Sequence, residues 1–424
     1  MLFGLAVLSA LIWFGLIFFH GWFWQAGPIL RPEPPGTSPA DIMPDVTVVI
    51  PARDEAESIE VALSSLLTQD YAGRLSLILV NDRSEDGTGA LARALPDPKG
   101  RLTVLDGADP EPGWSGKLWA VAQGVAEARR QQDANSGYIL LTDADIVHAP
   151  EHISTLVAKA QTDRLHMVSE MVELQCESLA ERALVPAFVF FFALLYPFAQ
   201  VNNPKSRTAG AAGGTILIRR DMLAEIGWID ALKGALIDDC TLATCVKQAG
   251  GRLYLGHSCL ARSIRPYPHA VDVWRMIART AFVQLRYSPL FLVLTVLAMG
   301  VVWIAPGLIA VFGHGLTRWI GLGTWLVSTG SFVPTLRRFR LSPLWALTLP
   351  FVAIFYTAAT IGSAVNHYRG RGVVWKNRAY TEAIPNDGRA TPAATSATTS
   401  ATTSASGAAA PEQVQTAQVP GGRG

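Results

Sequence analysis

Two aspartates, Asp143 and Asp145, stand at the end of an apolar run in the segment LLTDADIVHAP. A strand that only filled a hydrophobic core would not need to end on two like charges. Carboxylates that converge in one crevice repel each other unless a cation neutralises them. Hard oxygen ligands suit Mg²⁺ or Mn²⁺, and a diphosphate would complete the coordination shell. The D-x-D pattern therefore favours a metal that bridges to a nucleotide diphosphate, although alone it also fits a loop or a helix cap.

Acidic residues also follow two earlier apolar runs. Asp54 and Glu55 come after VTVVIPAR, and Asp82 comes after LSLILVN. Three runs that end in acids indicate one shared site more strongly than any single run does. Side chains two residues apart in an extended segment point the same way, so Asp143 and Asp145 would face one ligand together.

The apolar runs alternate with helical patterns between Val46 and Tyr287. The runs are unbroken, which indicates strands of a parallel sheet that helices cover on both faces. In such sheets ligands bind beyond the carboxyl ends of the strands, where these acids lie. The predicted strands are VTVVIPA, LSLILVN, RLTVLDG and YILLT, and the predicted helices include GKLWAVAQGVAEARRQ.

The N-terminal residues, Leu2 to Trp24, are almost wholly apolar and carry no Lys, Arg, Asp or Glu. That length suits a membrane span, and the basic start and small-x-small site of a cleaved signal peptide are not convincing. We therefore expect a retained transmembrane anchor within residues 1–25. The first basic residue, Arg31, follows the anchor, so the positive-inside rule places the next part in the cytoplasm.

A second apolar region, 289–365, is expected to be a C-terminal transmembrane region. Three crossings would leave the basic juxtamembrane segment 366–386 outside, against the positive-inside rule, so we expect one hydrophobic segment to be re-entrant. Pro306 and Pro350 are candidate breaks. The three hydrophobic segments are 289–312, 319–336 and 343–365.

An uncharged stretch at 183–201 is nearly long enough to span a membrane as well. If it crossed, Asp145 and Asp239 would lie on opposite sides of the bilayer and could not share a site. Two placements remain open: a helix in the membrane interface, which would present a lipid-linked acceptor, or a buried core helix.

Charge and cysteine content exclude some classes of protein. Lys and Arg total 35 and Asp and Glu total 34, so the net charge of +1 argues against a bulk nucleic-acid binder. The four cysteines have no metal-binding spacing, and a cytoplasmic placement predicts free thiols. The segment 387–424 is low in large apolar residues and is predicted to be disordered.

In order and spacing, four segments resemble the family 2 glycosyltransferases, which have the GT-A nucleotide-diphospho-sugar fold. The segments are VVIPARDE, LVNDRSEDGT, LTDADI and LIDDCTLATCVKQAGGRLYL. Within that family, GWSGKLWA, GWIDALKGALIDDCTL and VVWKNRAY are similar to the hopene-associated glycosyltransferases of bacterial hopanoid gene sets. The resemblance implies an α/β GT-A catalytic domain over 46–288, with a mixed, mostly parallel sheet and helices on both faces, plus transmembrane helices.

The resemblance also implies roles for the acids. Asp54 and Asp82 would contact the nucleotide base and ribose, with Glu55 in the same nucleotide-sugar site. Asp145, with Asp143 alongside, would meet the metal, Mg²⁺ or Mn²⁺, and the diphosphate.

The pair Asp238–Asp239 stands where the family has its catalytic base, most often on the second acid. The family usually has Glu-Asp there, so the Asp-Asp of this chain keeps both residues as candidates, with Asp239 preferred. Inverting sugar transfer needs one carboxylate to deprotonate the acceptor hydroxyl, and a metal to stabilise the departing diphosphate as a Lewis acid. The alternative is that the pair only caps the helix that follows it.

Basic residues complete the predicted site. Lys117 lies in the glycine-flanked GWSGK before a helix, which is a setting that binds phosphate; a solvated lysine is the alternative. Gln284 and Arg286, in QLRYS, are the nearest match to the family's Q-x-x-R-W and are expected to reach the diphosphate, unless such cations are only membrane-proximal. His148 and His152 are expected to be surface or helix-start histidines.

These observations together predict a multi-pass enzyme of the bacterial inner (cytoplasmic) membrane with its catalytic domain in the cytoplasm. It would be an inverting, metal-dependent glycosyltransferase that moves a sugar from a nucleotide-diphospho-sugar, UDP-linked, to a hopanoid or polyprenoid lipid, with no nucleic-acid partner. One alternative is a processive polysaccharide synthase, which would want an intact Q-x-x-R-W and more crossings. Another is a non-catalytic membrane scaffold, which would have lost the acids.

Overall fold

A computed structural model describes residues 1–32, 43–131, 136–370, 374–375 and 378–379 of the 424-residue chain. The segment 387–424, predicted to be disordered, lies outside the described residues. Of the predicted basic segment 366–386, only 366–370, 374–375 and 378–379 are described.

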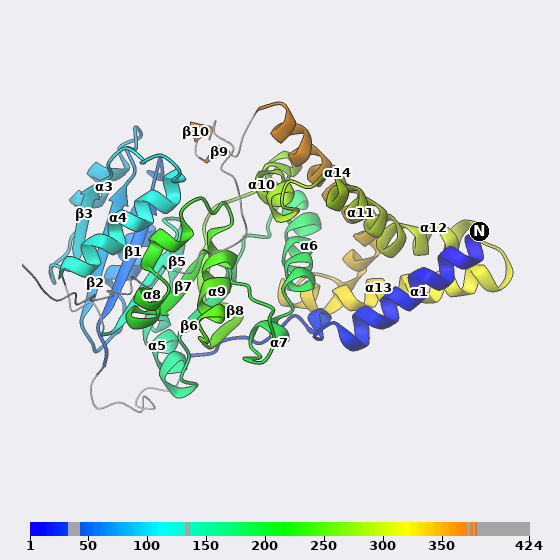
Figure 1. Ribbon diagram of the computed structural model, residues 1–424, viewed down its shortest axis with the longest axis horizontal. Helices are drawn as coiled ribbons and strands as arrows, with labels where there is room; N and C mark the ends of the chain where they lie inside the picture. Colours follow the sequence, from blue (N-terminus) through cyan, green and yellow to red (C-terminus); the bar gives the residue numbers. More distant parts are fainter. Residues whose placement is uncertain (33–42, 132–135, 371–373, 376–377, 380–424) are drawn as a thin grey trace, which may run out of the picture. The chain divides into compact units, whose positions relative to one another are not determined.

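The central element is a mixed sheet, which within the described residues has eight strands in the order β3-β2-β1-β4-β7-β6-β8-β5 (Figure 1). The pairs β1–β2, β2–β3, β1–β4 and β6–β8 are parallel, and β4–β7, β6–β7 and β5–β8 are antiparallel. This confirms the predicted mixed, mostly parallel sheet. The strands are β1 (Val46–Ala52), β2 (Leu75–Asn81), β3 (Leu102–Asp106), β4 (Tyr138–Thr142), β5 (Ile146–His148), β6 (Met167–Glu173), β7 (Thr215–Arg219) and β8 (Leu253–Ser263).

Helices cover both faces of the sheet because its strands are apolar on both sides. All seven residues of β1 are buried: Val49 packs into one core cluster, and Val48 and Ile50 pack into the other. Burial of each such side chain stabilises the fold by about 1.5–3 kcal/mol. One face carries α4 (Gly116–Gln131), α8 (Arg220–Glu225), η2 (Trp228–Leu232) and α9 (Asp238–Gln248); the other carries α2 (Ile59–Leu67), α3 (Thr88–Ala94) and α5 (His152–Thr162).

The uncharged stretch at 183–201 forms most of α6 (Leu179–Leu195) and all of α7 (Phe198–Val201). A capping box starts α6: Ser178 Oγ accepts the backbone N–H of Glu181, and the Glu181 carboxylate accepts the N–H of Ser178. Val189 packs into a core cluster of the sheet, whereas Phe190 packs into a cluster of the C-terminal helices. The helix therefore joins the two parts of the molecule and does not separate the two halves of the sheet.

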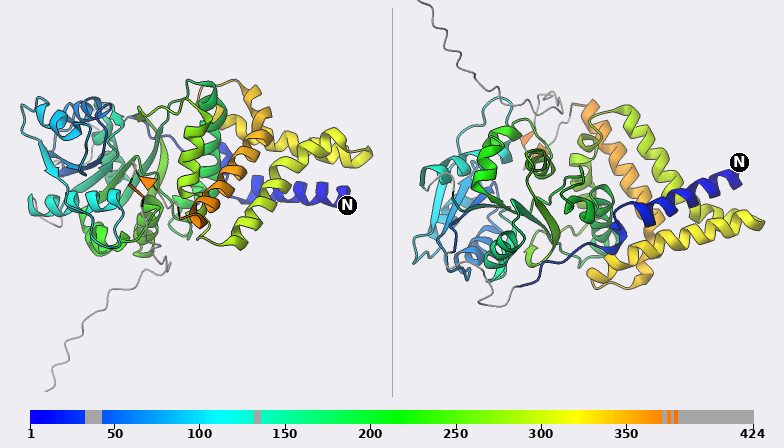
Figure 2. Two further views of the ribbon diagram at one scale, coloured as in Figure 1. Left: turned by 90° about the horizontal axis from the view of Figure 1, so that it is seen from above. Right: turned by 60° about the horizontal axis from the view of Figure 1, so that its bottom comes forward.

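The remaining helices form a bundle beside the sheet, and Figures 1 and 2 show α6 and α10 between the sheet and the rest of that bundle. Its elements are α1 (Leu2–Phe19), η1 (Phe23–Gln25), α10 (Ala270–Gln284), α11 (Pro289–Met299), the π-helical turn η3 (Gly300–Ile304), α12 (Ala305–Phe312), α13 (Gly315–Arg338), η4 (Pro343–Thr348) and α14 (Leu349–Tyr368). The short strands β9 (Val374–Trp375) and β10 (Arg378–Ala379) pair with each other.

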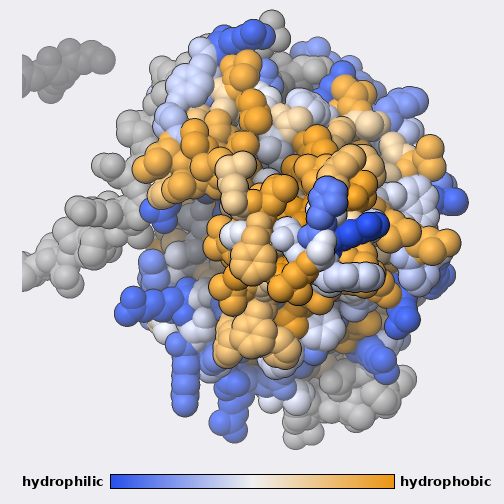
Figure 3. All heavy atoms as spheres, turned by 90° about the vertical axis from the view of Figure 1, so that its right-hand side faces the viewer, coloured by the Kyte–Doolittle hydropathy of each residue, from blue (hydrophilic) through white to orange (hydrophobic). Residues whose placement is uncertain are grey.

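Three of these helical segments are long and apolar enough to cross a membrane, among the described residues: Leu2–Phe19, Pro289–Phe312 and Pro343–Tyr368. The predicted segment 319–336 is also helical, within α13, but α13 does not meet that criterion of length and hydropathy. Figure 3 shows that the end of the bundle where the N-terminus and α12 lie has a largely apolar surface. Membrane association of this part is therefore supported.

The N-terminal helix is fastened to the C-terminal helices by one polar contact. The indole N–H of Trp13 donates to the carbonyl oxygen of Val302 at 2.8 Å, and the Trp13 and Trp303 rings meet edge to face with centroids 4.8 Å apart. A π-helical turn shifts the regular pattern of backbone hydrogen bonds. Here η3 supplies the carbonyl that satisfies a buried indole.

Candidate functional site

The chain does not continue straight from β4 to β5 but turns at Asp143–Asp145, where the Ile146 N–H donates to the Asp143 carbonyl oxygen. The predicted extended geometry of the D-x-D segment is therefore wrong. The reason is that β4 ends in its pairing with β7, whereas Ile146 already pairs with β8. The two carboxylates reach different cations.

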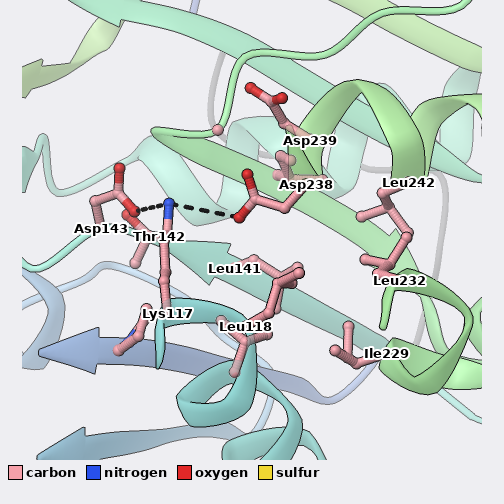
Figure 4. A pocket seen from close by; sticks show the side chains of 14 residues that line it. Lys117, Leu118, Leu141, Thr142, Asp143, Ile229, Leu232, Asp238, Asp239 and Leu242 are labelled. Atoms are coloured by element: carbon pink, nitrogen blue, oxygen red, sulfur yellow. Dashed lines mark ion pairs between the residues drawn. The ribbon is translucent and has the colours of Figure 1, made fainter. Parts of the chain in front are cut away.

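Asp143 faces a pocket at the carboxyl ends of β1 and β4, which Figure 4 shows from close by. Lys117, in the first turn of α4, lies at its centre: the Lys117 Nζ is 2.8 Å from Asp143 Oδ1 and 3.7 Å from Asp238 Oδ2. The pocket is open to solvent and contains about 400 Å³ of empty space, its mouth included. It is lined by Pro51, Lys117, Leu118, Val121, Leu141, Thr142, Asp143, Gly213, Ile216, Ile229, Leu232, Asp238, Asp239 and Leu242.

Lys117 is thus ion-paired and partly buried, with 27% of its side chain exposed, and it lies in the helix and not in the loop before it. Burial opposes its charge, but the carboxylates of Asp143 and Asp238 outweigh burial and raise the pKa of Lys117. Burial also raises the pKa of Asp143, against the effect of Lys117. The pocket therefore holds a permanent cation between two acids from distant parts of the chain.

Asp239 occupies a different position from Asp238. Both acids lie in the first turn of α9, whose N-cap position is Ile237, so neither is the N-cap residue. Figure 4 shows the Asp239 carboxylate turned away from Lys117. Asp239 Oδ1 accepts the Cys240 N–H at 2.7 Å, and a Cβ added to Gly213 would lie 3.2 Å from Oδ2, a tight contact that the Asp239 carboxylate would have to relieve by a small shift.

Burial, followed by the charge of Asp238, raises the pKa of Asp239 to about 7. A carboxylic acid with such a pKa exchanges its proton near neutral pH, which is what a general base requires. Asp239 therefore combines a place in the pocket lining with a suitable proton affinity.

Asp145 binds a cation that the sequence did not reveal. Arg265 Nε lies 2.6 Å from Asp145 Oδ2, and Arg265 Nη2 lies 2.7 Å from Glu55 Oε1. These charges outweigh burial and raise the pKa of Arg265. Arg265 follows β8 directly, and the N–H of Ile264 donates to the Asp145 carbonyl oxygen, which holds the segment beside the D-x-D turn. No motif points to this arginine, because only strand order brings it to the acids.

The acids after β1 and β2 shape the neighbouring loops. Asp54 has a positive φ of 50°, and its Oδ1 accepts the Glu85 N–H at 2.9 Å. The Asp82 side chain is fully buried, and Arg53 Nη1 lies 3.7 Å from its Oδ2. Asp54 is partly exposed at this edge of the sheet, whereas the Asp82 carboxylate faces inward in this structure.

The two residues of the imperfect Q-x-x-R-W are not in the pocket lining. Gln284 Nε2 donates to the Tyr196 hydroxyl at 2.7 Å, so it links the ends of α10 and α6. Burial, together with Cys240 and Asp239 nearby, raises the pKa of Tyr196. Gln284 therefore lies on the Asp239 side of the site, through Tyr196, while Arg286 is exposed.

His148 and His152 are both buried, so a surface placement is wrong for each; His152 begins α5, which agrees with the helix-start alternative, whereas His148 ends β5. His152 Nε2 lies 2.7 Å from Glu170 Oε2, His148 Nδ1 lies 2.8 Å from His152 Nδ1, and His148 Nε2 lies 3.2 Å from Thr142 Oγ1. Burial lowers the pKa of His148. The chain of contacts connects β6 to the end of β4, directly before Asp143, which sequence spacing alone could not show.

The acids suit a divalent cation only with help from a substrate. Among the described residues there is no group of three or more His, Cys, Asp or Glu side chains placed to hold a metal. Asp143 and Asp145 offer hard oxygen donors on one turn, and the charge of Asp145 acts on Asp143. Mg²⁺ is commonly bound by one or two carboxylates plus substrate phosphates, so this donor set fits such an ion.

Comparison with known proteins identifies the class of the sheet domain. Residues 47–227 match the family model described as Glycosyl transferase family 2. The structure is similar to that of the mannosyltransferase PcManGT from Pyrobaculum calidifontis, solved in complex with GDP-Man and Mn²⁺. That likeness has a TM-score of 0.50 at 18% identity, and it covers 87% of this chain and 99% of the other.

Two curated relatives carry related names. The chain is 31% identical over 154 residues to the succinoglycan biosynthesis protein ExoO of Rhizobium meliloti (strain 1021), which covers 34% of this chain and 40% of that protein. It is 26% identical over 125 residues to an N-acetylglucosaminyltransferase of Bradyrhizobium elkanii, and this match covers 28% of this chain and 62% of that protein. The chain spans less than two thirds of the length of either relative.

The sheet domain thus has the GT-A fold, and residues 47–227 match the family model of glycosyltransferase family 2. This confirms the predicted fold class and enzyme class. The family match ends before α9, so it does not include Asp238 or Asp239.

Proposed function

We propose that the protein is a membrane-bound, inverting glycosyltransferase that moves a sugar from a nucleotide-diphospho-sugar to a lipid acceptor. The observation that carries the proposal is the pocket at the strand ends. There Lys117 joins Asp143 and Asp238, and Asp239 beside them has a pKa of about 7. A catalytic base and a cationic centre stand together in one crevice of a family 2 domain.

The chemistry follows from these positions. Asp239 takes the proton of the acceptor hydroxyl as that oxygen attacks the anomeric carbon of the sugar. The bond between the anomeric carbon and the diphosphate oxygen breaks, and the nucleoside diphosphate leaves with the bonding electrons. Attack from the face opposite the leaving group inverts the anomeric configuration.

The leaving diphosphate needs positive charge. Asp143 and Asp145 would hold a divalent ion, Mg²⁺ or Mn²⁺, which supplies that charge when it is bound. Lys117 Nζ, already at the D-x-D turn, gives a second cation that needs no proton transfer to act. The structural neighbour PcManGT was solved in complex with Mn²⁺, which supports the choice of ion. Asp54, Glu55 and Asp82 would form the nucleotide end.

A lipid is the acceptor that the surroundings of Asp239 favour. Tyr196, close to Asp239, ends α6, which packs against the apolar helices. An acceptor held in the bilayer would therefore reach the base from the α6 side. Resemblance to the hopene-associated enzymes makes a hopanoid or polyprenoid alcohol our first choice, and UDP our first choice of nucleotide. With Arg31 after the anchor, the catalytic domain would face the cytoplasm of a bacterial inner membrane.

The relative named for succinoglycan biosynthesis favours a second candidate, transfer to a growing saccharide. A processive synthase would be supported by products with more than one added sugar. A non-catalytic scaffold would show no transfer at all.

Purified full-length protein, incubated with radiolabelled UDP-sugars and a lipid extract, tests these alternatives. We expect one labelled, lipid-extractable product. Asp239→Asn should lower transfer about 10²–10⁴-fold, the range for loss of a general base, while nucleotide binding persists. Asp145→Ala should lower transfer and weaken Mn²⁺ binding.

The exposed Asp70, changed to Asn and to Ala in turn, is the matched control for both substitutions. Full activity in Asp239→Asn would refute its role as the base. Activity lost only in Asp238→Asn would move that role to Asp238.

A further inference from the structure

Hydropathy and packing select different helices as membrane spans. By length and hydropathy the candidates are α1, the α11–α12 segment and the η4–α14 segment, but not α13. The packing of α13 and α14 indicates the opposite: α13 crosses the membrane and α14 does not.

α13 packs along both of the other candidate spans, α1 and α12. A Cβ on Gly321 would lie 2.6 Å from Ile309 Cγ2, and Trp325 approaches Gly307. Small residues at close helix contacts are typical of helix packing within membranes. A helix that lies alongside two crossing helices must cross with them.

Buried hydroxyl groups explain the low hydropathy of α13. Thr324, Ser328 and Thr329 donate to carbonyl oxygens one turn earlier in their own helix, at 2.8–2.9 Å. A polar group satisfied within its own helix can enter hydrocarbon at little cost. The mean hydropathy of the segment is therefore low although its polar groups need no water.

The two ends of α13 lie far apart. Its first turn follows the Gly313–His314 turn from α12, where Arg318 Nε donates to the Ala310 carbonyl oxygen. Near its last turn, Arg338 Nη2 donates to the carbonyl oxygen of Ser258 on β8 at 2.7 Å. α13 thus returns the chain from the far end of the bundle to the sheet (Figure 1).

α14 packs along α10 in the same direction, and it also contacts α11 and η3. Phe355 contacts Trp274 near the start, and Ser363 Oγ donates to Ala278 O at 2.5 Å further on. At the end, His367 stacks on Tyr287 with centroids 4.5 Å apart. Tyr287 lies two residues before α11, so α14 ends where the first C-terminal span begins.

The charged residues of α10 indicate that neither α10 nor α14, which packs against it, crosses the bilayer. Asp272, Arg275 and Arg279 lie on α10, and both arginines are exposed. Charged side chains at the centre of a bilayer are costly, so α10 lies outside the hydrocarbon core. A helix paired with α10 along its length does not cross either.

We propose that α1, α11–α12 and α13 cross the membrane, and that η4–α14 lies along the bilayer surface on the side of the sheet. This inference rests on the proposed membrane attachment. The exposed apolar side chains of α14 then dip into the lipid headgroup region, as on an amphipathic surface helix. They include Phe351, Ile354, Ile361 and Val365.

The proposal also removes the conflict over charge. With two crossings after the sheet domain, the arginines at 337–340 and Arg369 lie on the same side as the catalytic site, as the positive-inside rule requires. The re-entrant segment predicted from the sequence is then α14.

Single cysteines, introduced into a full-length chain whose native cysteines are replaced by serine, test this topology in intact cells with a membrane-impermeant maleimide. His314→Cys should be labelled from outside, whereas Ser342→Cys and Arg369→Cys should be labelled only in inside-out vesicles. All three positions are exposed. A chain that keeps only the exposed native Cys259, on β8, is the control for the side of the sheet.

Labelling of Arg369→Cys from outside, with Ser342→Cys protected, would show that α14 crosses and would overturn the proposal. Outside labelling of Ser342→Cys would overturn it as well, because α13 would then not cross. Transfer activity measured on the same membranes reports separately on the proposed function. Activity without the expected labelling refutes only the topology, and the expected labelling without activity refutes only the function.

Discussion

The strand-end pocket and the α13 interface both contain polar groups that are partly or fully buried, but these groups find their hydrogen-bond or ion-pair partners in different ways. In the pocket, Lys117 reaches Asp143 and Asp238 from another part of the chain. Along α13, Ser328 and Thr329 bond to the preceding turn of the same helix. Polar groups in the first region depend on tertiary structure, and those in the second depend only on the helix.

This difference has a practical consequence. A substitution in the sheet region leaves the partner of the lost side chain without a hydrogen bond or ion pair. A substitution in α13 removes a hydroxyl donor whose carbonyl acceptor already accepts a backbone hydrogen bond. An unpaired buried polar or charged group is the costly event in both cases. Substitutions of similar size should therefore have unequal effects in the two regions.

The largest effect on stability is expected for His152→Leu. The substitution leaves the buried Glu170 carboxyl group without its imidazole partner, which typically costs about 3–5 kcal/mol. Thermal unfolding in detergent, followed by gel filtration, should show a large fall in the melting temperature. Ser154→Ala, on the same helix, is the control. A melting temperature equal to that of the control would contradict the comparison.

Lys117→Met is expected to have the next largest effect. Loss of the central cation leaves Asp143, Asp238 and Asp239 repelling one another, and transfer at pH 7 should fall about 100-fold. Because Lys117 lowers the pKa of Asp239, its removal should also move the acidic limb of the pH–rate profile to higher pH. Lys117→Arg keeps the charge and should retain the wild-type position of that limb. An unshifted limb in Lys117→Met would be inconsistent with the pocket geometry.

The pH dependence of the unmodified protein should show a smaller effect. A general base acts in its ionised form, and Asp239 has a pKa of about 7. The transfer rate should rise about tenfold per pH unit below pH 7 and level off above it. Asp239→Glu, measured under single-turnover conditions, should move the limb. A rate independent of pH between 5 and 8 would exclude Asp239 as the base.

Ser328→Ala should have the smallest effect. Its hydroxyl donates to a carbonyl of the same helix, so alanine leaves no group stranded and stability should change by about 0.5 kcal/mol or less. Gly321→Leu on the same face, which would meet Ile309, should cost about 1–3 kcal/mol. If Ser328→Ala destabilised the protein as much as His152→Leu, the distinction between the two regions would fail.

Much of the sheet could be predicted because its strands have a local signal. The runs that became β1, β2 and β4 are apolar on both faces, and this pattern indicates parallel strands without further information. The antiparallel pairing of β4 with β7 has no such signal, since it joins segments more than seventy residues apart. The D-x-D turn went unforeseen for the same reason.

The acids of the candidate site could be predicted because they follow apolar strands. The cationic side chains that pair with them could not. Asp143, Asp238 and Asp239 line one pocket. Arg265 and Tyr196 belong to no motif, because strand order and the fold of α6 bring them there. Local sequence patterns identify the acids, whereas their partners can be identified only from the folded structure.

The contact between Trp13 and Val302 has a consequence for biogenesis. The donor and the acceptor are 289 residues apart, so Trp13 leaves the ribosome long before its acceptor is made. At about 5–20 residues per second that interval lasts roughly 15–60 s. Throughout it, α1 exists without the C-terminal helices that it packs against. This helix contact can therefore form only after η3 has been made.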